Sequence, residues 1–154
     1  MGLPKIRILF VDDEEHNLIS FKASFRTKYA IETALSGQDA IEMLKEKQFD
    51  IIITDQRMPK MTGVEFLEQI IPIYPEPIRI LLTGYTDMAA VIDAINKGKI
   101  FHYLNKPWNE TELDDTIQKA YMAYLEKKKM QEENEQLSVT NEQLEFLLRQ
   151  KLLS

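Results

Sequence analysis

The sequence predicts an α/β fold, a doubly wound five-stranded parallel sheet in the order 2-1-3-4-5, followed by a long C-terminal helix that extends into a coiled coil. Three observations lead to this prediction. Short runs of β-branched residues alternate five times with amphipathic segments before residue 110. The run over residues 49–54 is almost wholly apolar, as in a strand covered on both faces. From residue 110 onward the chain contains neither glycine nor proline.

Length and composition narrow the class further. A chain of 154 residues suits about one domain. Its net charge of −6 argues against a protein that coats nucleic acid or an anionic membrane, and the absence of cysteine excludes disulfides and thiolate metal sites. No apolar run approaches the ~18 residues of a membrane span, and the N-terminus lacks a signal-peptide stretch. We therefore expect a soluble, cytoplasmic protein with no membrane contact.

The first two strand–helix units occupy residues 5–47. Strands are expected over residues 5–11 and 30–35, each followed by a helix, over 16–28 and 37–47. The first helix has an apolar stripe formed by Leu18, Ile19, Phe21, Phe25 and Tyr29. Ser36 precedes the second helix and is suited to cap its N-terminus.

Three more strands complete the predicted sheet. They are expected over residues 49–54, 78–82 and 100–104, with helices over 64–73 and 87–97 between them. Prolines after residue 71 end the first of these helices, and Gly98 lies just past the end of the second. Because each strand is followed by a helix, the strands should run parallel, with helices on both faces.

The last third of the chain is too long for an ordinary globular helix. A seven-residue repeat places Lys127, Asn134, Asn141 and Leu148 at a, and Met130, Leu137, Leu144 and Lys151 at d. Asparagine at a pairs well across a parallel two-stranded coil, so we expect a parallel homodimer. The alternative is a single solvated helix, which the two lysines favour. Residues 4–125 then form one domain and 126–154 a dimerisation helix.

Three acidic residues fall at the ends of neighbouring strands. Asp12 and Asp13 follow the first strand, and Asp55 follows the third. Ligands of open parallel sheets bind at the carboxyl ends of the strands, so the three carboxylates should meet there and repel one another. Mg²⁺, which prefers oxygen ligands, would reconcile them. Aspartate is common at strand ends, but three at two adjacent strands are poorly explained by that habit alone.

Two further polar residues end the last strands. Thr83 closes the run ILLT and supplies a hydroxyl, and Lys106 follows the last strand and supplies a cation. Lys106 precedes Pro107, so the bond between them can be cis at modest cost. Carboxylates, a hydroxyl and a cation on one rim predict a site for phosphoryl transfer.

The segments FVDDEE, IIITDQRMPKMTG, ILLTG and YLNKPW resemble those of the receiver domain of two-component response regulators, which has a flavodoxin-like fold. The resemblance spans about residues 4–125 and implies that Asp55 accepts a phosphoryl group. It also implies that Asp12, Asp13, Asp55 and the backbone carbonyl of Arg57 bind Mg²⁺. The segments TDQRMP, LLTGYTD and NKPW further resemble a subgroup often fused to cyclic-di-nucleotide enzymes or to hydrogenase-type transcription regulators.

The resemblance also assigns the switch. Lys106 and Thr83 would each bind a phosphoryl oxygen, and Tyr103, three residues before Lys106, would turn inward when Thr83 moves. Gly63 matches a glycine after the acceptor loop, where backbone freedom is expected. Phosphorylation would shift a two-state equilibrium that the coiled coil passes on.

The implied partner is a sensor histidine kinase or a phosphotransfer protein. The domain would partly catalyse its own phosphorylation and dephosphorylation without being a turnover enzyme. Two alternatives remain: a receiver-like dimerisation protein without phosphorylation, and a phosphatase of the haloacid dehalogenase type. The phosphatase needs two aspartates two positions apart after the first strand, whereas Asp12 and Asp13 are adjacent. The chain shows no helix-turn-helix pattern, so no direct nucleic-acid binding is expected, and it either acts as it stands or belongs to a longer protein.

Overall fold

The computed structural model describes residues 4–84 and 88–153. Its five strands form one parallel sheet in the order β2-β1-β3-β4-β5, which confirms the predicted topology. The strands are β1 (Arg7–Val11), β2 (Ala30–Ala34), β3 (Ile51–Asp55), β4 (Ile78–Thr83) and β5 (His102–Asn105). Because all five run in the same direction, their carboxyl ends lie along one edge of the sheet.

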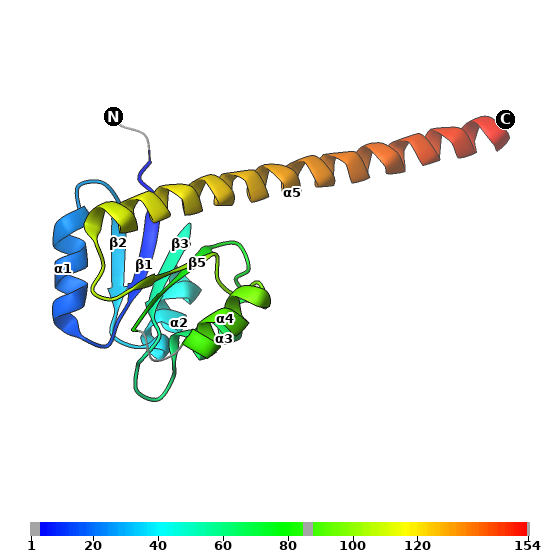
Figure 1. Ribbon diagram of the computed structural model, residues 1–154. Coiled ribbons are helices and arrows are strands. Elements are labelled where there is room, and N and C mark those ends of the chain that lie inside the picture. The colour runs from blue at the N-terminus through cyan, green and yellow to red at the C-terminus, as the bar shows by residue number, and fades with distance from the viewer. Residues whose placement is uncertain (1–3, 85–87, 154) are drawn as a thin grey trace.

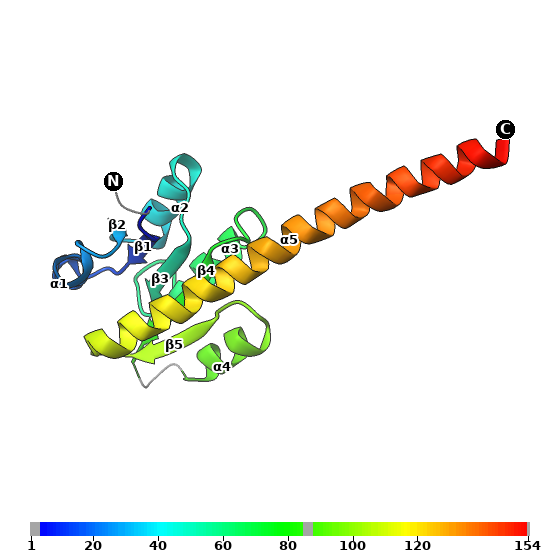
Figure 2. The same ribbon diagram turned by 90° about the horizontal axis from the view of Figure 1, so that it is seen from above.

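Helices cover both faces of the sheet (Figures 1 and 2). They are α1 (Glu15–Phe25), α2 (Gly37–Glu46), α3 (Gly63–Ile70), α4 (Met88–Asn96) and α5 (Glu110–Leu153). One core joins the sheet to α1 and the first half of α5, and the other joins it to α2, α3 and α4. Two buried faces explain the continuous apolar runs within the central strands, such as residues 51–53 of β3 and 80–82 of β4. None of the described helices combines the length and apolarity needed to cross a bilayer.

Helix α1 is shorter than its sequence pattern predicts. It ends at Phe25, and Tyr29 lies beyond it, buried just before β2. Ile19 was expected on the buried stripe, and this prediction is wrong, because its side chain is 63% exposed. Leu18, Phe21 and Phe25 follow the three-to-four-residue spacing of one helix face, whereas Ile19 is turned about 100° from Leu18.

Local capping sets the limits of the other helices. The Ser36 hydroxyl accepts a hydrogen bond from the Asp39 amide at 3.1 Å, as predicted. Thr62 and Glu65 cap α3 reciprocally, so α3 begins at Gly63, and it ends at Ile70, before Pro72. The predicted start of α4 at residue 87 lies outside the described residues. Gly98 has φ +71° just past α4, as expected of a glycine after a helix.

Helix α5 has two unlike halves. Leu113, Ile117 and Ala120 are fully buried against the sheet. From Leu125 to Leu152 every residue is exposed, and Figure 2 shows this part running well beyond the domain. The structure confirms the long C-terminal helix, whereas the coiled coil stays a prediction.

Polar contacts hold the buried half of α5 to the segment between α1 and β2. The Tyr29 hydroxyl donates to Asp114 and accepts a hydrogen bond from the Gln118 side chain at 2.8 Å. Lys28 forms an ion pair with Asp114 at 2.5 Å. Burial and the hydrogen bond to Asp114 raise the pKa of Tyr29, so the phenol stays protonated. These contacts fix the direction in which α5 leaves the domain.

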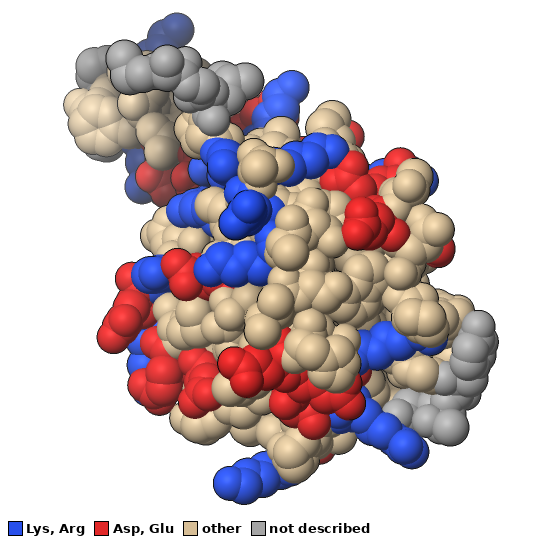
Figure 3. All heavy atoms as spheres, turned by 90° about the vertical axis from the view of Figure 1, so that its left-hand side faces the viewer, with Lys and Arg blue, Asp and Glu red and all other residues tan. Residues whose placement is uncertain are grey.

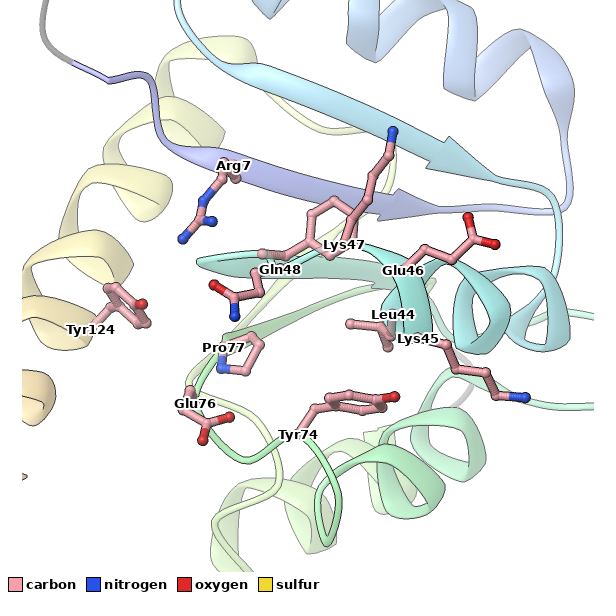
Figure 4. A pocket seen from close by; sticks show the side chains of 11 residues that line it. Arg7, Leu44, Lys45, Glu46, Lys47, Gln48, Tyr74, Glu76, Pro77 and Tyr124 are labelled. Carbon is pink, nitrogen blue, oxygen red and sulfur yellow. The ribbon is translucent and has the colours of Figure 1, made fainter.

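A cavity of about 490 Å³ opens at the amino-terminal edge of the sheet, away from the strand ends that carry the acidic residues (Figure 4). Arg7, Gln48, Tyr74, Pro77 and Tyr124 are among the residues that line it. The Arg7 guanidinium is held by Asp50, with Nη2 and Oδ1 2.8 Å apart. The cavity therefore lies where α5 passes the base of the domain.

Candidate phosphoryl-transfer site

The three predicted carboxylates meet at the carboxyl edge of the sheet. Asp12 and Asp13 lie directly after β1, and Asp55 is the last residue of β3. One carboxylate oxygen of each lies within 4.8 Å of the other two. Asp12 and Asp55 are buried and Asp13 is exposed, so the cluster opens to solvent on one side. Figure 3 shows the face of the molecule that carries α1, and Asp and Glu side chains gather in the lower half of that face.

Asp12 is held in place by three donors. Its Oδ1 accepts a hydrogen bond from the Glu14 amide at 3.0 Å, and its Oδ2 accepts one from the Asn17 side chain at 3.1 Å. The Lys106 ammonium donates to the same Oδ2 at 2.7 Å. Asn17 was missed by the sequence analysis, because an asparagine in the first turn of a helix usually faces solvent. Its position, five residues after Asp12, was the available signal.

Lys106 bridges two of the carboxylates. Its Nζ lies 2.7 Å from Asp12 and 3.3 Å from Asp55. Burial alone would lower the pKa of Lys106, but the hydrogen bond to Asp12 and the charge of Asp55 raise it. The ammonium thus stays charged beside Asp55. The peptide bond to Pro107 is cis.

The surroundings of Asp55 disfavour the charged form of its carboxyl group. Burial raises its pKa to about 6, and the charges of Asp12 and Asp13 add to this rise. Lys106 opposes the shift without cancelling it. A further cation nearby would stabilise the charged form of Asp55.

The donor set fits Mg²⁺. Three carboxylates with converging oxygens face one lysine, so when all three are ionised their negative charge exceeds the lysine's positive charge by two. Hard oxygen ligands, one of them on an exposed residue, suit an ion that keeps several waters. Arg57 follows Asp55 by two residues, with an exposed side chain. Its carbonyl as a ligand stays a prediction.

Thr83 and Tyr103 lie at the adjacent strands. Thr83 is buried at the end of β4, and its hydroxyl donates to the carbonyl oxygen of Gly84 at 3.0 Å. Tyr103 is half-buried in β5 and packs against the core beneath α2, α3 and α4. Their roles in a switch stay predictions.

Gly63 is required for a reason other than the one expected. Its φ is not positive, so backbone freedom does not explain it. A Cβ at this position would lie 2.3 Å from the Asp55 carbonyl oxygen, which makes close packing of α3 on the acceptor loop the reason. Gln56, missed by the sequence analysis, ties the same parts together: its buried side chain accepts a hydrogen bond from the Val64 amide at 2.9 Å.

Comparison with known families agrees with this geometry. The family model described as the response regulator receiver domain matches residues 8–118. The chain therefore belongs to the response regulator receiver domain family, a class of signalling domains of two-component systems.

Individual relatives place the chain within this class. It is 35% identical over 116 residues to the hydrogenase transcriptional regulatory protein HoxA of Cupriavidus necator, a match that covers 75% of this chain and 24% of HoxA. The chain thus spans about a quarter of that curated relative. The signal receiver domain of an HD domain-containing protein from Pseudomonas fluorescens is 30% identical, with a TM-score of 0.77, over 84% of this chain and 96% of that one.

A second similar structure contains a ligand. The response regulator TrrA from Thermotoga maritima, solved in complex with Mg²⁺ and BeF, is 28% identical to this chain. Its TM-score is 0.67, and the match covers 75% of this chain and 98% of that one.

Proposed function

We propose that this chain accepts a phosphoryl group on Asp55, with Mg²⁺ as cofactor, from a sensor histidine kinase or a phosphotransfer protein. The observation that carries the proposal is the convergence of Asp12, Asp13, Asp55 and Lys106 at one edge of the sheet. A merely structural cluster of this kind would be costly, because two of its carboxylates are buried beside each other. The chemistry of phosphoryl transfer gives that arrangement a use.

Transfer needs little covalent chemistry from the protein. A carboxylate oxygen of Asp55 attacks the phosphorus atom of a phosphohistidine, the new O–P bond forms as the P–N bond breaks, and the imidazole leaves with a proton. Bound Mg²⁺ would neutralise charge on the phosphoryl oxygens. Lys106, already held beside Asp55, offers its ammonium to one of those oxygens.

The product is an acyl phosphate in a buried corner. It adds negative charge and strong acceptor oxygens where the Thr83 hydroxyl can turn toward them. Thr83 would exchange its local bond to Gly84 for one to the phosphoryl group. Tyr103 would follow into the space that Thr83 vacates, which links the chemistry to the β4–β5 edge.

The exposed half of α5 would then carry the signal. Four apolar residues of the predicted seam, Met130, Leu137, Leu144 and Leu148, are each more than half exposed. An exposed apolar stripe on a 44-residue helix favours a partner helix over full solvation. We propose a parallel homodimer through residues 126–154, with residues 4–125 as the phosphorylated domain.

Phosphorylation is tested by incubating the full chain with Mg²⁺ and acetyl phosphate and measuring the mass increase of one phosphoryl group. Asp55→Asn should abolish incorporation, because the nucleophile is lost. Asp39→Asn, an exposed aspartate on α2, is the matched control and should incorporate as the wild type does. Undiminished labelling of Asp55→Asn would place the acceptor elsewhere, and an unlabelled wild type would favour a receiver-like dimerisation protein.

A further inference from the structure

Three polar side chains share one face of the sheet near the phosphoryl-transfer site. Asn105, the last residue of β5, is paired in register with Thr83, the last residue of β4. Leu82 and Leu104, which precede them, both belong to the core beneath α1 and α5. Side chains alternate along a strand, so Thr83 and Asn105 point to the other face. Tyr103, two residues before Asn105, packs on that face as well.

Asn105 is unusual in its hydrogen bonding. Its Oδ1 is buried and accepts no hydrogen bond, and across residues 4–84 and 88–153 it is the single buried side-chain oxygen or nitrogen in this condition. Buried polar atoms are paired in the great majority of cases, and an exception calls for an explanation. The neighbouring Thr83 hydroxyl is occupied with the Gly84 carbonyl. The resting structure therefore contains an unused acceptor beside the residue expected to move.

We propose that Asn105 is a positioning residue of the switch, and that its carboxamide completes its hydrogen bonds only when Asp55 is phosphorylated. The inference rests on the function proposed above. The Thr83 oxygen can accept an N–H while its hydroxyl donates, and we expect rotation of the hydroxyl from the Gly84 carbonyl to a phosphoryl oxygen to turn its lone pairs toward Asn105. The Asn105 oxygen then accepts the O–H of Tyr103 as that ring turns inward.

The chemistry of the three groups explains why an amide suits this position. A phosphoryl oxygen only accepts, so Thr83 must donate to it and can then only accept from a neighbour. Tyr103 brings a donor that needs an acceptor when its hydroxyl leaves water. A carboxamide supplies both, whereas an aliphatic side chain supplies neither. Because its oxygen is unpaired at rest, Asn105 also makes the resting state less favourable relative to the phosphorylated one.

The experiment measures the affinity of the full-length chain for beryllofluoride in the presence of Mg²⁺. Trp108, the single tryptophan, lies two residues after Lys106 and packs edge-on against Phe10, so its fluorescence reports on the site. Asn105→Leu keeps the shape of the side chain and removes both hydrogen-bonding groups. We expect it to weaken binding about 5- to 10-fold, or about 1 to 1.4 kcal/mol. The control Asn96→Leu, exposed at the end of α4, should change binding less than about twofold.

A double-mutant cycle separates positioning from general damage. If Asn105 acts through the Tyr103 hydroxyl, Tyr103→Phe should weaken binding as well, and adding Asn105→Leu to it should cost clearly less than in the wild type. Additive effects, or binding by Asn105→Leu within about twofold of the wild type, would overturn the inference. Should Asn105→Leu fail to fold, the smaller Asn105→Ala takes its place in the same cycle.

Two further arms distinguish this inference from the proposed function. If the wild-type chain responds to beryllofluoride and Asp55→Asn does not, the acceptor site stands, and the cycle alone decides the role of Asn105. If the wild type itself gives no response, the proposed function fails and the inference fails with it.

Discussion

The two halves of α5 obey different physical constraints although they belong to one helix. Residues 110–124 have a face that is buried on the sheet, and ion pairs and hydroxyl contacts hold them to the region after α1. Residues 125–152 are all exposed, several of them with apolar side chains, and the Lys127 ammonium donates a hydrogen bond to the Pro75 carbonyl oxygen at 3.0 Å. Helices in proteins owe most of their stability to packing, so the first half is secured within the domain. The second half would need to pack against a partner helix to reach the same stability.

This difference also divides the functions. Every residue of the candidate phosphoryl-transfer site lies in the sheet domain, at or next to the end of a strand, so the sheet determines its position. The exposed half carries none of these groups and presents only a surface. If Asp55 is phosphorylated as proposed, the signal has two routes out of the domain, the buried half of α5 and the β4–β5 edge.

The largest expected effect comes from removing the exposed half. A chain that ends at residue 126 keeps the whole sheet and both cores, and it loses the predicted seam. We expect it to be monomeric where the full chain is a dimer, because the apolar stripe is gone. Light scattering over a concentration series measures the change. Equal stoichiometry of the two chains would refute the coiled coil, and phosphate incorporation by the shortened chain is the control for folding.

A matched pair of substitutions places the boundary within the helix. Ile117→Ala removes a fully buried side chain and should lower the free energy of unfolding by about 2–4 kcal/mol. Leu137→Ala, in the exposed half, should leave the unfolding of the domain within about 0.5 kcal/mol and weaken dimerisation instead. Urea unfolding, followed in dilute protein, measures the first quantity, and sedimentation measures the second. Equal destabilisation of the domain by both would show that the two halves fold as one unit.

The sequence predicted the buried part better than the details of the site. The strand order and the meeting of Asp12, Asp13 and Asp55 follow from alternating segments and from the rule that parallel strands end at one edge. The pairing of Lys106 with Asp12 could not be predicted, because it depends on how far a long side chain reaches across the folded rim. Gln56 was missed for the same reason.

Helix faces show a second limit of the sequence. An apolar residue such as Ile19 matches the composition of a buried stripe, and only its angle on the helix decides that it is exposed. Gly63 shows a third limit of the sequence, because no sequence pattern indicates that α3 approaches the Asp55 carbonyl so closely.

The smallest expected effect is a dependence of the free energy of unfolding on pH, which arises at Asp55 in the sheet domain. The pKa of Asp55 is raised by burial from 3.8 to about 6, so between these values the folded chain binds more protons than the unfolded chain. The contribution of Asp55 to the free energy of unfolding should therefore fall as pH rises from about 4 to about 6, by at most about 3 kcal/mol at ~1.4 kcal/mol per pKa unit. Asp55→Asn lacks this titration and should gain stability relative to the wild type over the same window.

Urea unfolding of both chains without Mg²⁺, at several pH values, tests this expectation. Saturating Mg²⁺ should reduce the difference above pH 6, because an ion that binds only the folded state stabilises it by mass action. A difference between the two chains that stays constant with pH would mean that the buried carboxylate is not under strain. The charged form of Asp55 would then carry no unfavourable free energy for a bound cation to relieve.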